Sequence, residues 1–82
     1  MVAAAHMTLD ELKIGQRGQI TQLEGDSPLT QRLMVLGLLE GTVVKMIRRA
    51  LGGDPIEIDV MGYCLSLRKA EARHILIEQL PK

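Results

Sequence analysis

The chain has 82 residues, of which 46% are hydrophobic, and its ten basic residues balance ten acidic ones. It contains one tyrosine and neither tryptophan nor phenylalanine, which argues against a base-stacking platform for single-stranded nucleic acid and against an aromatic groove for proline-rich peptides. The zero formal net charge also argues against stand-alone binding of duplex DNA, because such binding depends on excess positive charge facing the phosphates.

The length of the chain predicts its domain organisation, and its cysteine content indicates the cellular compartment. We assign residues 7–82 to one domain with a small aliphatic core, and residues 1–6 to a leader or a cloning remnant. The single cysteine, Cys64, cannot form an intramolecular disulfide, and no apolar run approaches the roughly 20 residues of a membrane-spanning helix. The expected location is therefore cytoplasmic, without direct insertion into a membrane.

The first elements of the domain are predicted from capping residues and alternation. Thr8 and Glu11 have the spacing of a capping box, which indicates a short helix. A strand is expected over residues 18–24. Within it, Ile20 and Leu23 break strict alternation, so we expect a β-bulge or a strong twist at this point.

A short amphipathic helix is predicted next. Ser27 can act as its N-cap, and Pro28 suits the first helical position. Its buried face is expected to carry the leucines that recur at helical spacing, namely Leu29, Leu33 and Leu36. Gly37 can end the helix in the left-handed conformation, with the apolar Leu38 packing back on the last turn.

A β-hairpin is predicted to follow, with strands at residues 42–50 and 56–60 joined by a Gly-Gly-Asp-Pro turn. The return strand alternates cleanly and is expected to bury Ile56, Ile58 and Val60. The apolar positions then change parity. Because the side-chain period of a strand is two, this change requires a turn, bulge or bend, which we place at Met61 and Gly62, before a strand at residues 63–67.

The chain is predicted to end with one turn of helix at residues 69–72 and a last strand that buries Ile75 and Ile77. About five short strands with two short helical insertions indicate a mostly β fold. We expect these strands to form a small, strongly bent barrel.

The whole pattern resembles the FeoA family of small cytosolic proteins associated with bacterial ferrous iron uptake. The resemblance spans about residues 7–80 and is carried by Thr8-Leu9-Asp10-Glu11-Leu12 with Gly15, Arg32-Leu33 through Leu36-Gly37-Leu38 with Gly41, Gly53-Asp54-Pro55-Ile56, and Leu67-Arg68. It implies an SH3-like barrel that works beside the polytopic ferrous iron permease FeoB, which carries a cytosolic GTP-binding domain. The implied role is accessory or regulatory, and not enzymatic.

Residues that could carry catalysis or hold a metal are few. No phosphate-binding loop is present, because the Gly15-Gln16-Arg17-Gly18 segment lacks the spacing and the lysine of a P-loop. The weak metal-ligand candidates are Cys64, His74 and Glu78, whose side-chain types bind Fe²⁺ or Zn²⁺. Their spacing matches no metal motif, so we expect no catalytic residue, no resident cofactor and at most weak metal binding.

An apolar corner beside arginine, at the end of the predicted helix, is the best candidate for a partner-binding surface, because interfaces favour apolar groups and arginine. The candidate residues are Arg32, Val35, Leu38, Leu39 and Glu40, with Arg48 and Arg49 as a charged rim. The expected partner is the cytosolic region of a FeoB-type permease, and nucleic acid is not expected. The alternative is that these leucines simply close the barrel.

A second hypothesis is a metal-responsive module, in which Fe²⁺ or Zn²⁺ controls dimerisation or partner affinity. Exposed edge strands of a short barrel would also allow a homodimer.

Overall fold

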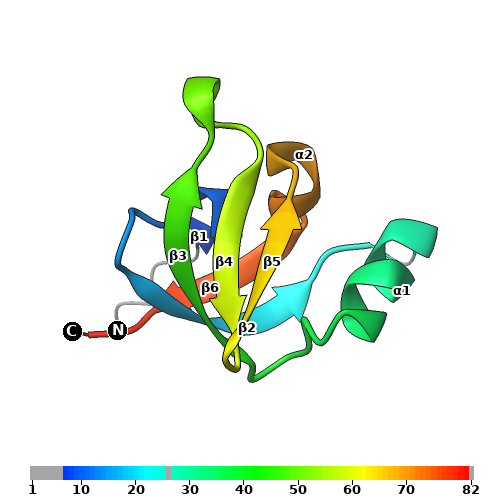
Figure 1. Cartoon of the computed structure of the whole chain (residues 1–82). Coiled ribbons are helices and arrows are strands. Elements are labelled where there is room, and N and C mark those ends of the chain that lie inside the picture. The colour runs from blue at the N-terminus through cyan, green and yellow to red at the C-terminus, as the bar shows by residue number, and fades with distance from the viewer. Residues whose placement is uncertain (1–6, 26, 82) are drawn as a thin grey trace.

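The computed structural model describes residues 7–25 and 27–81, and the predicted leader of residues 1–6 lies outside them. Within the described residues, all strands join one antiparallel sheet in the order β1-β6-β2-β3-β4-β5 (Figure 1). The elements are β1 (Met7–Thr8), the 3₁₀ helix η1 (Leu9–Glu11), β2 (Arg17–Leu23), α1 (Pro28–Val35), β3 (Val43–Arg49), the 3₁₀ helix η2 (Leu51–Gly53), β4 (Ile56–Val60), β5 (Tyr63–Leu67), α2 (Lys69–Ala72) and β6 (Ile75–Gln79).

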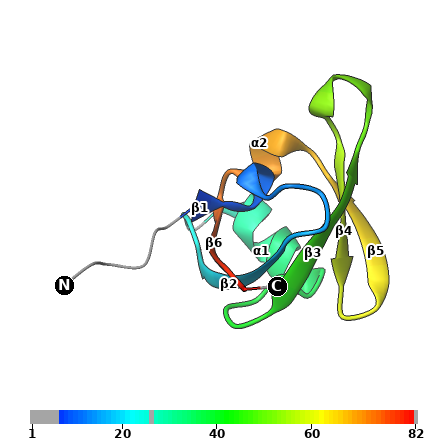
Figure 2. The same ribbon diagram turned by 90° about the vertical axis from the view of Figure 1, so that its left-hand side faces the viewer.

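The predicted mostly β fold is confirmed, with two corrections to the barrel. The sheet has a sixth strand, β1, whose two residues pair with Ile77 and Leu76 of β6 just before the predicted first helix. Local sequence could not indicate it, because so short a strand is defined only by its distant partner. The sheet also does not close, since β1 and β5 are its two outer strands and do not pair with each other (Figure 2).

Two irregularities bend the sheet. The predicted bulge in β2 is confirmed by a register shift against β6 between Ile20 and Gln22. A second shift, between Met46 and Arg48 of β3, was not predicted. Bulges increase local twist, and these two allow the sheet to curl around its own apolar face.

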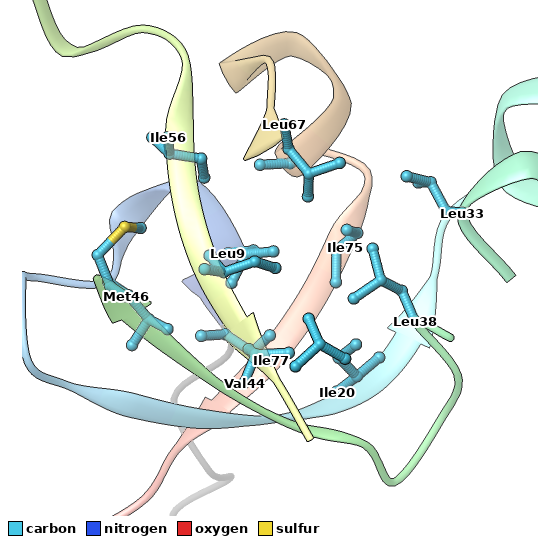
Figure 3. Close-up of a cluster of buried hydrophobic side chains, with 14 residues drawn as sticks. Leu9, Ile20, Leu33, Leu38, Val44, Met46, Ile56, Leu67, Ile75 and Ile77 are labelled. Carbon is cyan, nitrogen blue, oxygen red and sulfur yellow. The ribbon is translucent and has the colours of Figure 1, made fainter. Parts of the chain in front are cut away.

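The core is aliphatic, as the composition predicts, and lies inside the curled sheet (Figure 3). Its buried residues are Leu9, Leu12, Ile20, Leu33, Leu38, Val44, Met46, Ile56, Ile58, Val60, Leu67, Ala72, Ile75 and Ile77. The alternating burial predicted for β4 and for Ile75 and Ile77 is confirmed.

The β4–β5 connection is a two-residue turn at Met61 and Gly62, both with positive φ (+53° and +98°). It pairs Val60 with Tyr63 across the hairpin. Because the turn resets the pairing, Leu67 lies opposite the buried Ile56. The parity change predicted at this point is therefore a tight hairpin turn.

The predicted helix at Pro28 forms α1. The side chain of Ser27 accepts a hydrogen bond from the Thr30 amide at 3.4 Å. Of the three predicted inward leucines, Leu33 is fully buried, whereas Leu29 and Leu36 are only half-buried. The C-terminus has the glycine motif, with the Leu38 amide donating to the Leu33 carbonyl at 3.1 Å.

The other helical segments are single turns. In η1, the Glu11 carboxylate accepts hydrogen bonds from the Thr8 amide and hydroxyl, and these bonds lower the pKa of Glu11. In α2, Glu71 accepts from the Arg68 amide at 2.9 Å. No helix of the described residues is long and apolar enough to cross a membrane.

Candidate functional site

The loop that follows α1 forms an ordered corner, which we define as residues 37–42. Gly37 has φ +96° and begins the loop. Thr42 then fastens it, because its hydroxyl donates to the Gly37 carbonyl at 3.2 Å and accepts from the Leu39 amide at 3.3 Å. The Gly41 amide bonds the Ile20 carbonyl of β2 at 2.7 Å. The corner is therefore a fixed surface that projects Leu39 and Glu40.

A groove runs from the corner along β3 to the β4–β5 turn. Its apolar part comes from Leu39, Val43 and Met61, which are 45%, 38% and 81% exposed. The remaining lining residues are Arg17, Glu40, Gly41, Thr42, Val44, Lys45 and Asp59. An exposed apolar strip flanked by charges of both signs has the composition of a protein-binding surface, with an apolar centre and a polar rim.

A second hollow lies on the other side of the corner. Leu39 and Glu40 line it together with Gln22, Leu23, Gly25, Thr30 and Met34. Because Leu39 and Glu40 belong to both hollows, they form a ridge between them. A partner at this ridge would therefore contact α1, the corner and β3 at once.

The outward side of α1 extends the candidate surface. Val35 is 87% exposed, and the exposed Arg32 forms an ion pair with Glu71 of α2 at 3.0 Å. At the end of the helix, the hydroxyl of Tyr63 on β5 donates a hydrogen bond to the Leu36 carbonyl. These two contacts hold α1 to α2 and to β5.

One of the predicted partner-binding residues does not lie on the surface. Leu38 is fully buried, because the glycine motif at Gly37 turns its side chain back into the core. Its role is to anchor the corner. The predicted alternative, that these leucines close the fold, is thus right for Leu38 and Leu33, whereas Leu39 stays exposed.

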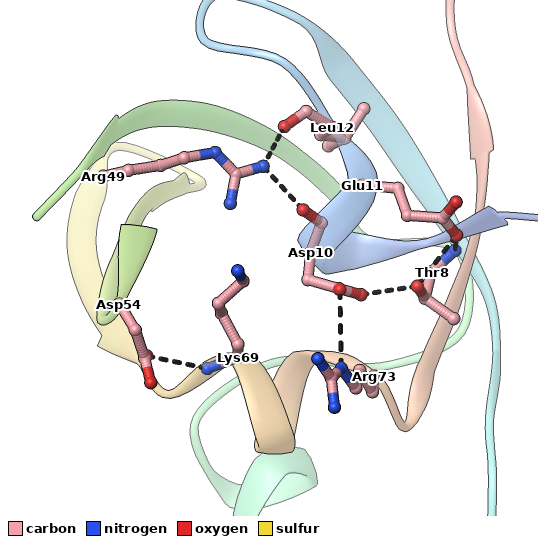
Figure 4. A network of polar contacts seen from close by, with 8 residues as sticks. All are labelled: Thr8, Asp10, Glu11, Leu12, Arg49, Asp54, Lys69 and Arg73. Carbon is pink, nitrogen blue, oxygen red and sulfur yellow. Dashed lines mark hydrogen bonds and ion pairs between the residues drawn. The ribbon is translucent and has the colours of Figure 1, made fainter. Parts of the chain in front are cut away.

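The two predicted rim arginines do not adjoin the corner. They lie at the far end of β3, and Arg48 is about 16 Å from Val43 at the rise of roughly 3.3 Å per residue of a strand. Arg48 pairs with Glu57 of β4 at 2.8 Å. Arg49 instead donates to the carbonyl oxygens of Asp10 at 2.5 Å and Leu12 at 2.6 Å (Figure 4). Arg49 therefore fastens the N-terminal segment to β3.

The three metal-ligand candidates are not brought together. Cys64 and Glu78 are exposed on β5 and β6, which three other strands separate in the sheet, and His74 is exposed between α2 and β6. Among the described residues, no group of three or more His, Cys, Asp or Glu side chains could hold a metal ion.

Sequence reasoning missed the part of the groove that other elements contribute. Val43 and Lys45 share the outward face of β3, opposite the buried Val44 and Met46. The available sequence signal was Val43, an apolar residue at a strand position whose side chain faces outward. Its proximity to Met61 depends on the pairing of Val44 with Val60, which no local pattern gives.

Comparison with known proteins identifies the family. The family model described as the FeoA domain matches residues 7–79. The chain belongs to the FeoA family. This family is associated with Fe²⁺ transport, and the match spans every described strand and helix.

Two curated relatives carry the same association in their names. The "Putative Fe(2+) transport protein A" of Campylobacter jejuni is 35% identical over 69 residues, which cover 84% of this chain and 93% of the relative. A "Fe(2+) transport protein A/Fe(2+) transporter FeoB fusion protein" of Porphyromonas gingivalis is 31% identical over 72 residues. That match covers 88% of this chain but only 8% of the fusion protein.

A solved relative confirms the fold. The FeoA of Stenotrophomonas maltophilia, described as a prokaryotic SH3 domain protein and solved in complex with zinc, superposes with a TM-score of 0.78. It is 26% identical, and the match covers 88% of this chain and 89% of the relative. The FeoA domain described here is thus an open, SH3-like sheet.

Proposed function

We propose that this chain is a non-enzymatic cytoplasmic accessory of bacterial ferrous iron uptake. In this proposal it binds the cytosolic region of a FeoB-type permease through the corner and the adjoining groove. The observation that carries the proposal is the exposed apolar strip of Leu39, Val43 and Met61 on a hydrogen-bonded, fixed loop. The fusion relative supports the choice of partner, since linking two proteins in one polypeptide raises their effective concentration for each other.

The shape of the surface suggests which residues supply affinity. Leu39 stands at the centre of the ridge between the two hollows and can be desolvated on all sides. Arg32 and Val35 extend the contact along α1, and Glu40 supplies charge at the rim. Residues at the well-packed centre of an interface usually dominate binding, whereas rim charges contribute more to specificity.

Regulation would follow from differential affinity. A bound protein shifts a conformational equilibrium of its partner only by as much as it prefers one state over the other. The accessory would therefore promote or restrain transport according to the permease conformation that fits the groove, without any chemistry of its own.

The direct test is a titration of isotopically labelled protein with the cytosolic GTPase region of its permease, with and without a GTP analogue and Fe²⁺. We expect saturable backbone amide shifts centred on residues 32–45 and Met61. Leu39→Asp should weaken binding at least about tenfold, as expected for a central anchor. Arg32→Glu should weaken binding less.

Matched controls exist in the same chain. Leu51 is fully exposed at the tip of the β3–β4 hairpin, far from the corner, so Leu51→Asp makes the same chemical change elsewhere. Arg48→Glu similarly matches Arg32→Glu, because both arginines are exposed and ion-paired. Equal binding by Leu39→Asp and Leu51→Asp, with both variants folded, would contradict the proposed surface.

The zinc complex of the Stenotrophomonas relative favours a second candidate function, in which a metal ion links two chains through exposed ligands such as Cys64 and His74. This candidate predicts a saturable rise in the melting temperature and in the sedimentation coefficient with Zn²⁺ or Fe²⁺. Both effects should disappear in a Cys64→Ser, His74→Ala variant. Unchanged values with either metal would exclude it.

A further inference from the structure

The free edge of β5 presents unpaired backbone groups. β5 is an outer strand and pairs only with β4. Its hairpin closes with the Val60–Tyr63 pair, and hydrogen-bonded pairs alternate with non-bonded ones along an antiparallel ladder. The N–H and C=O groups of Cys64 and Ser66 therefore point away from β4. In the described part of the chain, no other backbone or side-chain group bonds to them.

The residues of this edge carry no usual protection against strand pairing. Natural edge strands are blunted by charged residues, proline, bulges, very short length or a covering helix or loop. The end of α1 contacts β5 at Tyr63, but Cys64 and Ser66 stay exposed. The opposite edge follows the rule, because β1 has two residues. β5 has five residues, Tyr-Cys-Leu-Ser-Leu, with no charge and no proline, and its register against β4 is unbroken.

A polar hollow beside the edge carries excess positive charge. It is lined by Arg32, Pro55, Ser66, Leu67, Arg68 and Glu71. The carboxylate of Glu71 is already committed, with one oxygen paired to Arg32 and the other accepting from the Arg68 amide. The exposed Arg68 guanidinium has no ion-pair partner among the described residues.

We propose that β5 binds an extended acidic segment of a partner protein by strand addition. The backbone of that segment would pair with Cys64 and Ser66, and one of its carboxylates would contact Arg68. Backbone pairing supplies affinity in this recognition mode, and the side-chain contact supplies selectivity. β5 lies outside the groove at the corner, and the hollow shares only Arg32 with the proposed permease surface. The proposal does not depend on the permease.

The test uses a blocked peptide of about eight residues, a usual strand length, that alternates threonine and glutamate. The reference peptide has lysine in place of glutamate. Titration into labelled protein should give saturable shifts and slowed amide exchange at Cys64 and Ser66 with the acidic peptide. The lysine peptide should bind several-fold more weakly. No saturable shift at β5, or equal binding of both peptides, would overturn the proposal.

Ser66→Pro separates edge pairing from general contact. Proline removes the outward N–H of Ser66 and is tolerated where that group faces away from the neighbouring strand. Binding of the acidic peptide should be lost in Ser66→Pro and kept in Ser66→Ala, with the β4–β5 cross-strand contacts intact in both. Unchanged binding in a folded Ser66→Pro variant would overturn the proposal.

Arg68 provides a test that does not alter the backbone. Arg68→Gln should weaken binding of the acidic peptide about threefold, which is the effect expected from losing one exposed ion pair. Arg48→Gln should leave binding of this peptide unchanged. Equal effects of the two substitutions would contradict a specific contact.

Sedimentation of the protein alone tests whether a second copy of this chain binds the edge instead of an acidic segment. A dimer that Ser66→Pro dissociates would assign the edge to a second copy of this chain.

Discussion

Arg48 and Arg49 are adjacent in the sequence and have different roles in the fold. The bulge in β3 sends Arg48 outward to Glu57, where both side chains are partly solvated. Arg49 turns toward the N-terminal segment and donates hydrogen bonds to two carbonyl oxygens. One belongs to Asp10 within η1, and the other belongs to Leu12, which directly follows η1. Without that guanidinium, both carbonyls would lose a charged donor. The same residue type is therefore a surface ion pair at one position and a structural clamp at the next.

This difference is measurable at the residue scale. Arg49→Met should lower the free energy of unfolding by about 1–3 kcal/mol, because it removes hydrogen bonds from a charged donor to partly buried carbonyls. Arg48→Met should cost roughly 0–1 kcal/mol, the usual range for an exposed ion pair. Urea denaturation of the two variants compares them directly. An equal loss in both would contradict the clamp.

At the scale of elements, α1 depends on its attachments. A helix of eight residues is not stable alone in water. Leu33 and Leu38 anchor it in the core, the Gly37 motif fixes its end, and Arg32 and Tyr63 tie it to α2 and β5. The position of the proposed partner surface is therefore set by a few tertiary contacts around α1.

Removal of one attachment should loosen α1 without unfolding the sheet. In Tyr63→Phe the Leu36 carbonyl loses its hydroxyl donor, and we expect a loss of about 1 kcal/mol, typical of one hydrogen bond. Amide hydrogen exchange should accelerate at residues 36–39 and remain unchanged in β2 and β6. Acceleration spread evenly over the sheet would show that Tyr63 supports the whole core instead.

The elements that the sequence predicts are those with local signals. The capping residue Ser27, the left-handed Gly37 and the parity change at Met61 each depend on neighbours in the chain, and the structure confirms all three. The strand β1 depends on its distant partner β6. The inward turn of Leu38 follows from the local motif at Gly37, and that motif was the available signal against placing Leu38 in the partner surface. Of the groove at the corner, only Leu39 and Glu40 of the loop were predicted, because Val43 and Met61 come together through the pairing between β3 and β4.

At the scale of the whole molecule, basic and acidic residues are equal in number, and the two signs of charge are interspersed on the surface. The groove contains Arg17 and Lys45 as well as Glu40 and Asp59. Opposite charges in one surface create no broad field of one sign, so attraction to a uniformly charged polymer is weak. Recognition must then depend on shape and on local pairing of individual charges.

This balance predicts no appreciable affinity for duplex DNA. With a formal net charge of zero, few counterions would be released from the phosphates, and that release is the main sequence-independent source of DNA affinity. Fluorescence anisotropy of a labelled duplex should stay flat at moderate ionic strength with the protein at micromolar concentration. A saturable rise that weakens with added salt would indicate a basic face that the mixed charges do not suggest.

The hydrogen bond from Tyr63 to Leu36 has one more consequence. Tyr63 is the only aromatic residue among phenylalanine, tyrosine and tryptophan in the chain. All intrinsic ultraviolet emission of the protein therefore arises from the side chain that touches the end of α1. A partner free of both tryptophan and tyrosine that displaces the helix would change that emission, so the molecule contains its own optical reporter of events at the corner.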